Sequence, residues 1–158
     1  MDLHENVAGL AALLGTWRGN GHGSYPTITD FDYTDEWVFS HSGKPFIGFV
    51  QRTKSPTGAP MHTESGYLRG LADGTVEIVA ALPTGHTELG TGTVATDEHA
   101  LVLTTRAEVV STPAAKPVQQ ISRVFRVEGD VLTLELAMAA VGVPSTPHLT
   151  SRLVRVSS

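Results

Sequence analysis

Gly15-Thr16-Trp17-Arg18-Gly19-Asn20-Gly21-His22-Gly23 is the stretch of this chain that decides its fold. Glycine stands at position 15 and then at every second position from 19 to 23, in a segment typical of a β-strand. Because glycine has no Cβ, such a strand lets another backbone or a flat ligand come very close. A second interpretation stays open, in which the glycines only relieve the curvature of a strongly coiled barrel strand.

The segment before these glycines is the only one with a helical pattern. Asn6-Val7-Ala8-Gly9-Leu10-Ala11-Ala12-Leu13-Leu14 places apolar residues near i, i+3 and i+4, and Gly15 ends it. It is short enough to act as a plug or lid.

The rest of the chain consists of short β-type runs separated by Gly, Pro, Asp and Ser, which is the pattern of an all-β protein. We predict ten strands near 15–23, 33–41, 45–53, 61–71, 75–82, 86–96, 100–107, 117–128, 131–140 and 148–156. Asp73-Gly74 and Gly129-Asp130 are typical of hairpin turns. Short, regular connections favour an antiparallel up-and-down meander that closes into a barrel, since closure removes exposed sheet edges.

Alternation of apolar residues predicts which face of these strands lies inside. It is clearest where Leu132, Leu134, Leu136 and Met138 share one face of a strand. A barrel of about ten strands is wider than the eight-stranded kind that side chains alone can fill. We therefore expect space for a small ligand.

Length, charge and composition exclude several classes of function. The 158 residues suit a single domain, 1–158, with its own core. A formal net charge of −5 gives no positive field for nucleic acid, and the lack of cysteine excludes disulfides and thiolate-bound metals. The N-terminus resembles no export signal and no long apolar run occurs, so we expect a cytoplasmic protein without a membrane span.

Histidines are the residues that could bind a metal. They stand at positions 4, 22, 41, 62, 86, 99 and 148, with no pair at the i, i+4 spacing of zinc proteases. His148 follows a proline-containing loop and opens the last predicted strand, where the preceding Pro147 would restrict its backbone. A rim histidine of this kind is either a ligand or a solvated surface residue, and composition alone does not decide.

His62, next to Met61, is the second histidine of interest. Neighbouring strand residues point to opposite faces, so only one of the two should face into a regular barrel. The simpler alternative is a rim histidine bonded to Glu64.

The glycine-rich stretch also carries a family resemblance. Gly15-Thr16-Trp17-Arg18-Gly19-Asn20-Gly21 matches the Gly-x-Trp-x-Gly-x-Gly motif of the nitrobindins, and Tyr25-Pro26-Thr27-Ile28 follows as it does there. Further similar stretches occur in the same order and spacing at 31–33, 40–46, 60–67, 137–140 and 148–149. The chain resembles this family over essentially its whole length.

The resemblance implies a ten-stranded antiparallel barrel, related in shape to fatty-acid-binding proteins and lipocalins, with one heme b per chain near one mouth. It implies a ferric iron held by one axial histidine, isomerisation of peroxynitrite to nitrate, and nitric oxide as a further ligand. A non-catalytic carrier of heme or of another apolar ligand such as a fatty acid is the competing function, and a plain interaction scaffold is the third. Monomer and homodimer both stay open.

Family roles map onto single positions of this chain. His148 matches the axial histidine and Thr27 a heme-contacting threonine. Met61 and His62 match residues of the distal side, and Lys116 is placed to meet a heme propionate. The motif residues themselves are Gly15, Trp17, Gly19 and Gly21.

Overall fold

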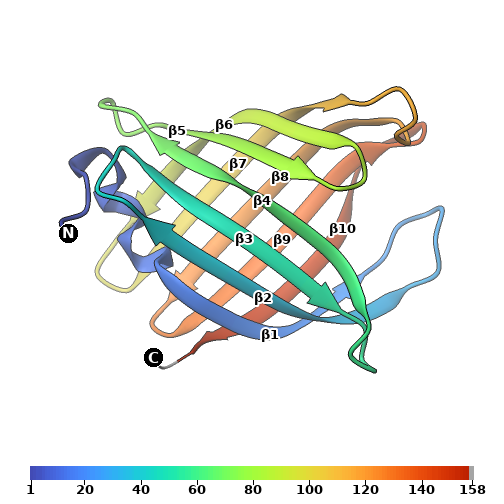
Figure 1. The fold of residues 1–158 in the computed structure, drawn as a ribbon, viewed down its shortest axis with the longest axis horizontal. Coiled ribbons are helices and arrows are strands. Elements are labelled where there is room, and N and C mark those ends of the chain that lie inside the picture. The colour runs from blue at the N-terminus through green and yellow to red at the C-terminus, as the bar shows by residue number, and fades with distance from the viewer. Residues whose placement is uncertain (157–158) are drawn as a thin grey trace.

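The computed structural model, which describes residues 1–156, is a closed antiparallel barrel of ten strands preceded by one short helix, η1 (Glu5–Leu13) (Figure 1). Each strand pairs with the next along the chain, and β1 closes the barrel against β10. The strands are β1 (Gly15–Gly23), β2 (Phe31–His41), β3 (Phe46–Lys54), β4 (Pro60–Gly70), β5 (Val76–Leu82), β6 (His86–Thr96), β7 (Ala100–Ser111), β8 (Val118–Glu128), β9 (Val131–Ala140) and β10 (Val143–Arg155). The predicted fold class is confirmed.

Three strands are longer than predicted, and β2 is the least extended of them, since it begins at Phe31 and the predicted start was 33. β7 runs to Ser111, and β10 begins at Val143, five residues before the predicted start. The two prolines of β10 had indicated a loop. Its register against β9 shifts twice, which accommodates residues that cannot donate to a regular ladder. His148 therefore lies within the last strand and does not open it.

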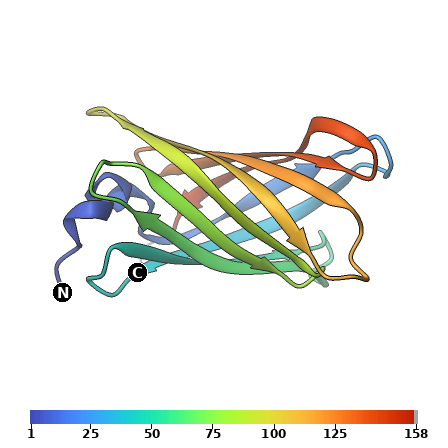
Figure 2. The same cartoon turned by 90° about the horizontal axis from the view of Figure 1, so that it is seen from above.

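The helix η1 is a 3₁₀ helix, which explains its apolar spacing. Val7, Leu10 and Leu13 are buried and stand three residues apart, so a helix with three residues per turn puts them on one edge. Trp17 Nε1 donates to the Leu13 carbonyl at 2.7 Å, and Arg155 donates to the carbonyls of Leu14 and Ala12. These bonds fasten η1 across one end of the barrel (Figure 2).

The interior changes character along the barrel axis. Near η1 it is apolar, with Leu10, Trp17, Ile78 and Phe125 almost without solvent contact. The opposite end, which we call the mouth, is bordered by the segments 24–30, 55–59, 83–85, 112–117 and 141–142. Between core and mouth lies a layer of buried polar side chains that includes Asp35, Gln51, Thr53, Glu64, Glu88, Thr105, Arg123 and Ser151.

The glycines of β1 make room for groups of the chain itself. A Cβ on Gly19 would collide with the Arg152 backbone of β10. Over Gly21 and Gly23 lie the rings of Tyr33 and Phe31 from β2. Another backbone thus comes very close at Gly19, as one of the predicted reasons requires, and aromatic side chains do so at Gly21 and Gly23.

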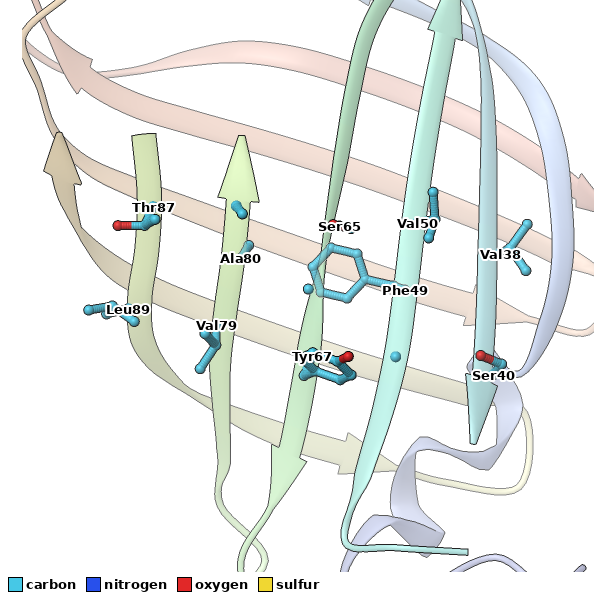
Figure 3. A pocket seen from close by; sticks show the side chains of 13 residues that line it. Val38, Ser40, Phe49, Val50, Ser65, Tyr67, Val79, Ala80, Thr87 and Leu89 are labelled. Carbon is cyan, nitrogen blue, oxygen red and sulfur yellow. The ribbon is translucent and has the colours of Figure 1, made fainter. Parts of the chain in front are cut away.

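A hollow of about 610 Å³ lies on the outside of the barrel, across β2 to β6 (Figure 3). Val38, Val50, Tyr67 and Leu89 line it, and they alternate with the buried residues of the same strands. These residues lie on the outer face of the barrel, whereas His62 of β4 lies on the inner face. Among residues 1–156, no helix is long and apolar enough to span a membrane.

Candidate functional site

A β-bulge positions His148 at the mouth. The register of β10 against β9 shifts between Pro147 and Leu149, and His148 is the extra residue there. Its carbonyl accepts a hydrogen bond from Ser24 N at 2.8 Å, and its Nδ1 lies 2.9 Å from the Ser24 carbonyl oxygen. Because a carbonyl can only accept, Nδ1 carries the proton in this bond. A bulge redirects a side chain, and bulges are over-represented next to active sites.

Two aromatic rings enclose the imidazole of His148. The Tyr25 ring packs edge-on at 5.4 Å between centroids, and Phe31 does so at 6.4 Å. The Tyr25 hydroxyl donates to the Met138 carbonyl at 3.0 Å and accepts from Ala140 N at 3.1 Å. These bonds tie the segment after β1 to β9 where the β9–β10 register is irregular. The direction of His148 is thus determined from several sides.

His148 has the properties of a metal ligand. Burial lowers its pKa, and the nearby His62 acts in the same direction, whereas the hydrogen bond that Nδ1–H donates to the Ser24 carbonyl acts against this shift. The imidazole is therefore neutral near pH 7, and its Nε2 has no hydrogen-bond partner among residues 1–156. A neutral imidazole whose Nδ1–H is held by a backbone carbonyl is the usual form of a metal-bound histidine.

His62 lies at a second bulge. The register of β4 against β3 shifts here, and Thr53 of β3 faces two residues, Met61 and His62. Thr53 Oγ1 accepts from His62 N at 2.9 Å and lies 3.4 Å from the His62 carbonyl oxygen. His62 Nε2 lies 3.1 Å from Glu64 Oε2, which is the hydrogen bond that the sequence suggested as the simpler role.

The other predicted contacts lie farther out on the rim. Met61 is on the outer face of β4 and 47% exposed, so only His62 of the pair faces inward. Thr27 is exposed in the 24–30 segment. Lys116 is exposed in the 112–117 segment, where its carbonyl accepts from His86 Nε2 at 2.7 Å. The structure brings His148 and His62 to one end of the barrel interior and leaves these three residues at its edge.

Sequence reasoning missed a buried ion cluster behind His62. Arg123 of β8 contacts Glu88 of β6 with Nε and Nη2, and its Nη1 lies 2.6 Å from Glu64 Oε1. Burial opposes ionisation of Glu64, but the charge of Arg123 outweighs it and lowers the pKa of Glu64 to about 2. The signal was available, because all three charges stand on the inward-facing parity of their strands, and the inward positions beside Arg123 are the apolar Ile121 and Phe125.

Asp35 of β2 is a second buried carboxylate, and it has no cation beside it among its hydrogen-bond partners. Gln51 Nε2 donates to it at 2.9 Å and Trp37 Nε1 at 3.2 Å. Burial raises its pKa, although the hydrogen bonds from Gln51, Ser151 and Trp37 act against that rise. Neutral donors alone therefore support this group.

The donor set fits a flat iron cofactor better than a bare metal ion. Within the part of the chain that the structure describes, no three His, Asp or Glu side chains gather to hold an ion directly. A porphyrin would supply four nitrogens itself, so a single imidazole would be enough to hold its iron. The aromatic and apolar walls beside His148 would bury its macrocycle.

Comparisons with known proteins cover nearly the whole chain. Residues 6–155 match the family model described as THAP4-like, heme-binding beta-barrel domain. A Mycobacterium marinum protein named peroxynitrite isomerase 2 is 47% identical over 99% of this chain and 98% of its own length. A Nocardia farcinica protein named peroxynitrite isomerase is also 47% identical, over 97% of this chain and 92% of its own. The crystal structure of Rv2717c from M. tuberculosis superimposes with a TM-score of 0.96 at 40% identity, covering 99% of this chain and 100% of that one.

Proposed function

The chain belongs to the family of THAP4-like, heme-binding β-barrel domains, and from this premise we propose that it binds one heme b through His148 and isomerises peroxynitrite to nitrate. The membership confirms the resemblance to the nitrobindins. The activity is that named for relatives which are 44–47% identical over nearly the whole chain. The observation that carries the proposal is the oriented imidazole of His148, whose Nε2 has no partner among residues 1–156 and whose lowered pKa favours the neutral form.

The reaction sets modest demands on the protein. Nitrate is an isomer of peroxynitrite, so the net conversion consumes neither electrons nor protons. The bound heme would supply a Lewis-acidic iron. The chain's part is to hold that group by His148, to fix the ring through the Ser24 carbonyl, and to bury the macrocycle against Tyr25 and Phe31. The mouth limits which molecules reach it.

We include nitric oxide as a further ligand and the ferric iron as the working state in this proposal. With His148 as the single protein ligand, the iron would be able to bind a small molecule as well. Thr27 and Lys116 are exposed on the rim, where side chains would meet the exposed edge of a bound heme.

Hemin titration of the purified apo-protein tests the heme site. We expect a saturable one-to-one change in the Soret band, and a loss of affinity of at least about 10- to 100-fold in His148→Ala, the range for removing a group that supports a bound metal. His99→Ala is the matched control, because His99 is exposed at the opposite end of the barrel. Equal hemin binding by His148→Ala and the wild type would overturn the assignment of His148 and favour a carrier of apolar ligands.

The rate of peroxynitrite decay tests the activity separately. The ferric holo-protein should accelerate decay beyond an equal concentration of free hemin, with nitrate as the product. A rate no greater than that of free hemin would leave a heme-binding protein without this enzyme activity.

A further inference from the structure

The buried cluster of Arg123, Glu64 and Glu88 carries more negative than positive charge. Arg123 Nη1 lies 2.6 Å from Glu64 Oε1, and Nε and Nη2 of the same guanidinium each donate to one carboxylate oxygen of Glu88. One guanidinium thus faces two carboxylates, and within residues 1–156 no further Lys or Arg contacts either carboxylate. The three side chains together hold one excess negative charge.

Folding alone does not require this excess charge. The exposed fractions of Glu64, Glu88 and Arg123 are 4%, 0% and 3%, so water hydrates these groups poorly. One carboxylate would be enough to pair with Arg123, and a second buried carboxylate adds a desolvation cost of its own. Salt screens buried charges much less than surface charges. The field of the excess charge therefore reaches neighbouring parts of the barrel interior.

The cluster lies beside the proposed heme site. It belongs to the layer of polar side chains between the apolar core and the mouth, and its Glu64 Oε2 lies 3.1 Å from Nε2 of His62. His62 in turn lies near enough to His148 for the two rings to interact electrostatically. A group held by His148 at the mouth would therefore lie within the field of the excess charge.

We propose that Glu64 and Glu88 hold the iron of the bound heme in its ferric form through the excess negative charge that they share with Arg123. A ferric ion carries one positive charge more than a ferrous ion, so a nearby buried anion stabilises it relative to the reduced form. The inference rests on the proposed function, in which the ferric iron is the working state. This role of the cluster needs no contact between the carboxylates and the heme.

The reduction potential of the hemin-loaded protein tests this role. Glu88→Gln removes one charge and leaves Glu64 paired with Arg123, and Glu64→Gln removes the same charge and leaves Glu88 paired. Each variant should raise the equilibrium constant for one-electron reduction by about 3- to 10-fold, equivalent to about 28 to 59 mV. A spectroelectrochemical titration measures this constant. At about pH 8.5 ordinary histidines are uncharged, so a change in the protonation of His62 does not compensate for the lost carboxylate.

Two control variants separate the charge of the cluster from its hydrogen bonds. Arg123→Lys keeps the charge but replaces the forked guanidinium by a single ammonium group. Glu36→Gln removes a carboxylate on the outer face of β2, where Glu36 pairs with Arg18 and solvent screens its charge. Both controls should change the reduction equilibrium by less than about twofold.

The possible results distinguish this inference from the proposed function. Unchanged potentials in Glu64→Gln and Glu88→Gln would overturn the inference. A shift in Arg123→Lys as large as theirs would also overturn it, because the contacts and not the charge would then determine the potential. Either result would leave heme binding by His148 intact. A wild-type protein that binds no hemin would defeat the proposed function, and this inference with it.

Discussion

The two ends of this barrel are built from the same ten strands by opposite means. At the η1 end the inward side chains are apolar, and Trp17, Leu10 and Phe125 fill the space. Toward the mouth the inward positions of the same strands carry ions, hydroxyls and histidines, and the registers of β4 and β10 are interrupted by bulges. Packing at one end stabilises the fold, and this allows the other end to keep polar and charged groups that contribute less to stability.

The largest loss of stability should come from removing the guanidinium of Arg123, which joins the two ends of the barrel. Arg123→Met leaves Glu64 and Glu88 buried without a cation. We expect the free energy of unfolding to fall by about 3–5 kcal/mol, as when one partner of a buried pair is removed. Urea denaturation measures it, with Arg126→Met, an exposed position of β8, as the control. An unchanged midpoint of urea denaturation would mean that the ion cluster does not stabilise the barrel.

A substitution at the η1 end should separate stability from ligand binding. Leu10→Ala deletes a fully buried side chain and should lower the free energy of unfolding by about 2–5 kcal/mol. Hemin affinity of the folded protein should stay within about twofold, since distant sites act independently. Leu89→Ala, on the outer face, is the control for stability. A large loss of hemin affinity in Leu10→Ala would show that the two ends are coupled.

The smallest expected effect is on the pH dependence of stability, in which the two buried carboxylates, Glu64 and Asp35, should differ. The pKa of Glu64 is lowered to about 2 in the folded state, so its contribution is complete above pH 4.5 and is lost as the pH falls toward 2. The pKa of Asp35 is raised by burial, so its contribution is complete below its unfolded value of 3.8 and is lost as the pH rises through its folded value.

Unfolding free energies between pH 2.5 and 7 measure both contributions. The difference between wild type and Glu64→Gln should increase with pH below 4.5, and that between wild type and Asp35→Asn should decrease with pH above about 4. If both differences in unfolding free energy changed with pH in the same direction, Arg123 would not be the reason that the pKa of Glu64 and that of Asp35 shift in opposite directions.

Local patterns predicted the fold well because they determine most of it. Strand alternation and hairpin glycines located all ten strands, and residues such as Leu132 and Ile78 are buried as the period requires. The start of β10 was wrong because prolines indicate a turn unless a bulge accommodates them, and a bulge depends on the partner strand. For the same reason the sequence did not show which of Met61 and His62 faces inward. The bulge forms against Thr53, which lies in another strand.

The buried ions were overlooked for a different reason. Glu64, Glu88 and Arg123 lie on three strands, and 35 to 59 residues separate Arg123 from its partners. Only the register of the closed barrel brings them together. The role of Tyr25 was similarly invisible, because its hydroxyl bonds to backbone groups 113 and 115 residues away.

The bulges at His62 and His148 also bear on how this scaffold can change. Each bulge has a residue in excess of the paired ladder, so exchanging that residue alters no cross-strand partnership and shifts no neighbour to the other face. The side chains that determine the chemistry of the mouth can thus be exchanged without changing the strand pairing of the barrel. New ligating or hydrogen-bonding side chains can be tried at positions 62 and 148, by evolution or in the laboratory, while the alternating sequence that encodes the barrel stays as it is.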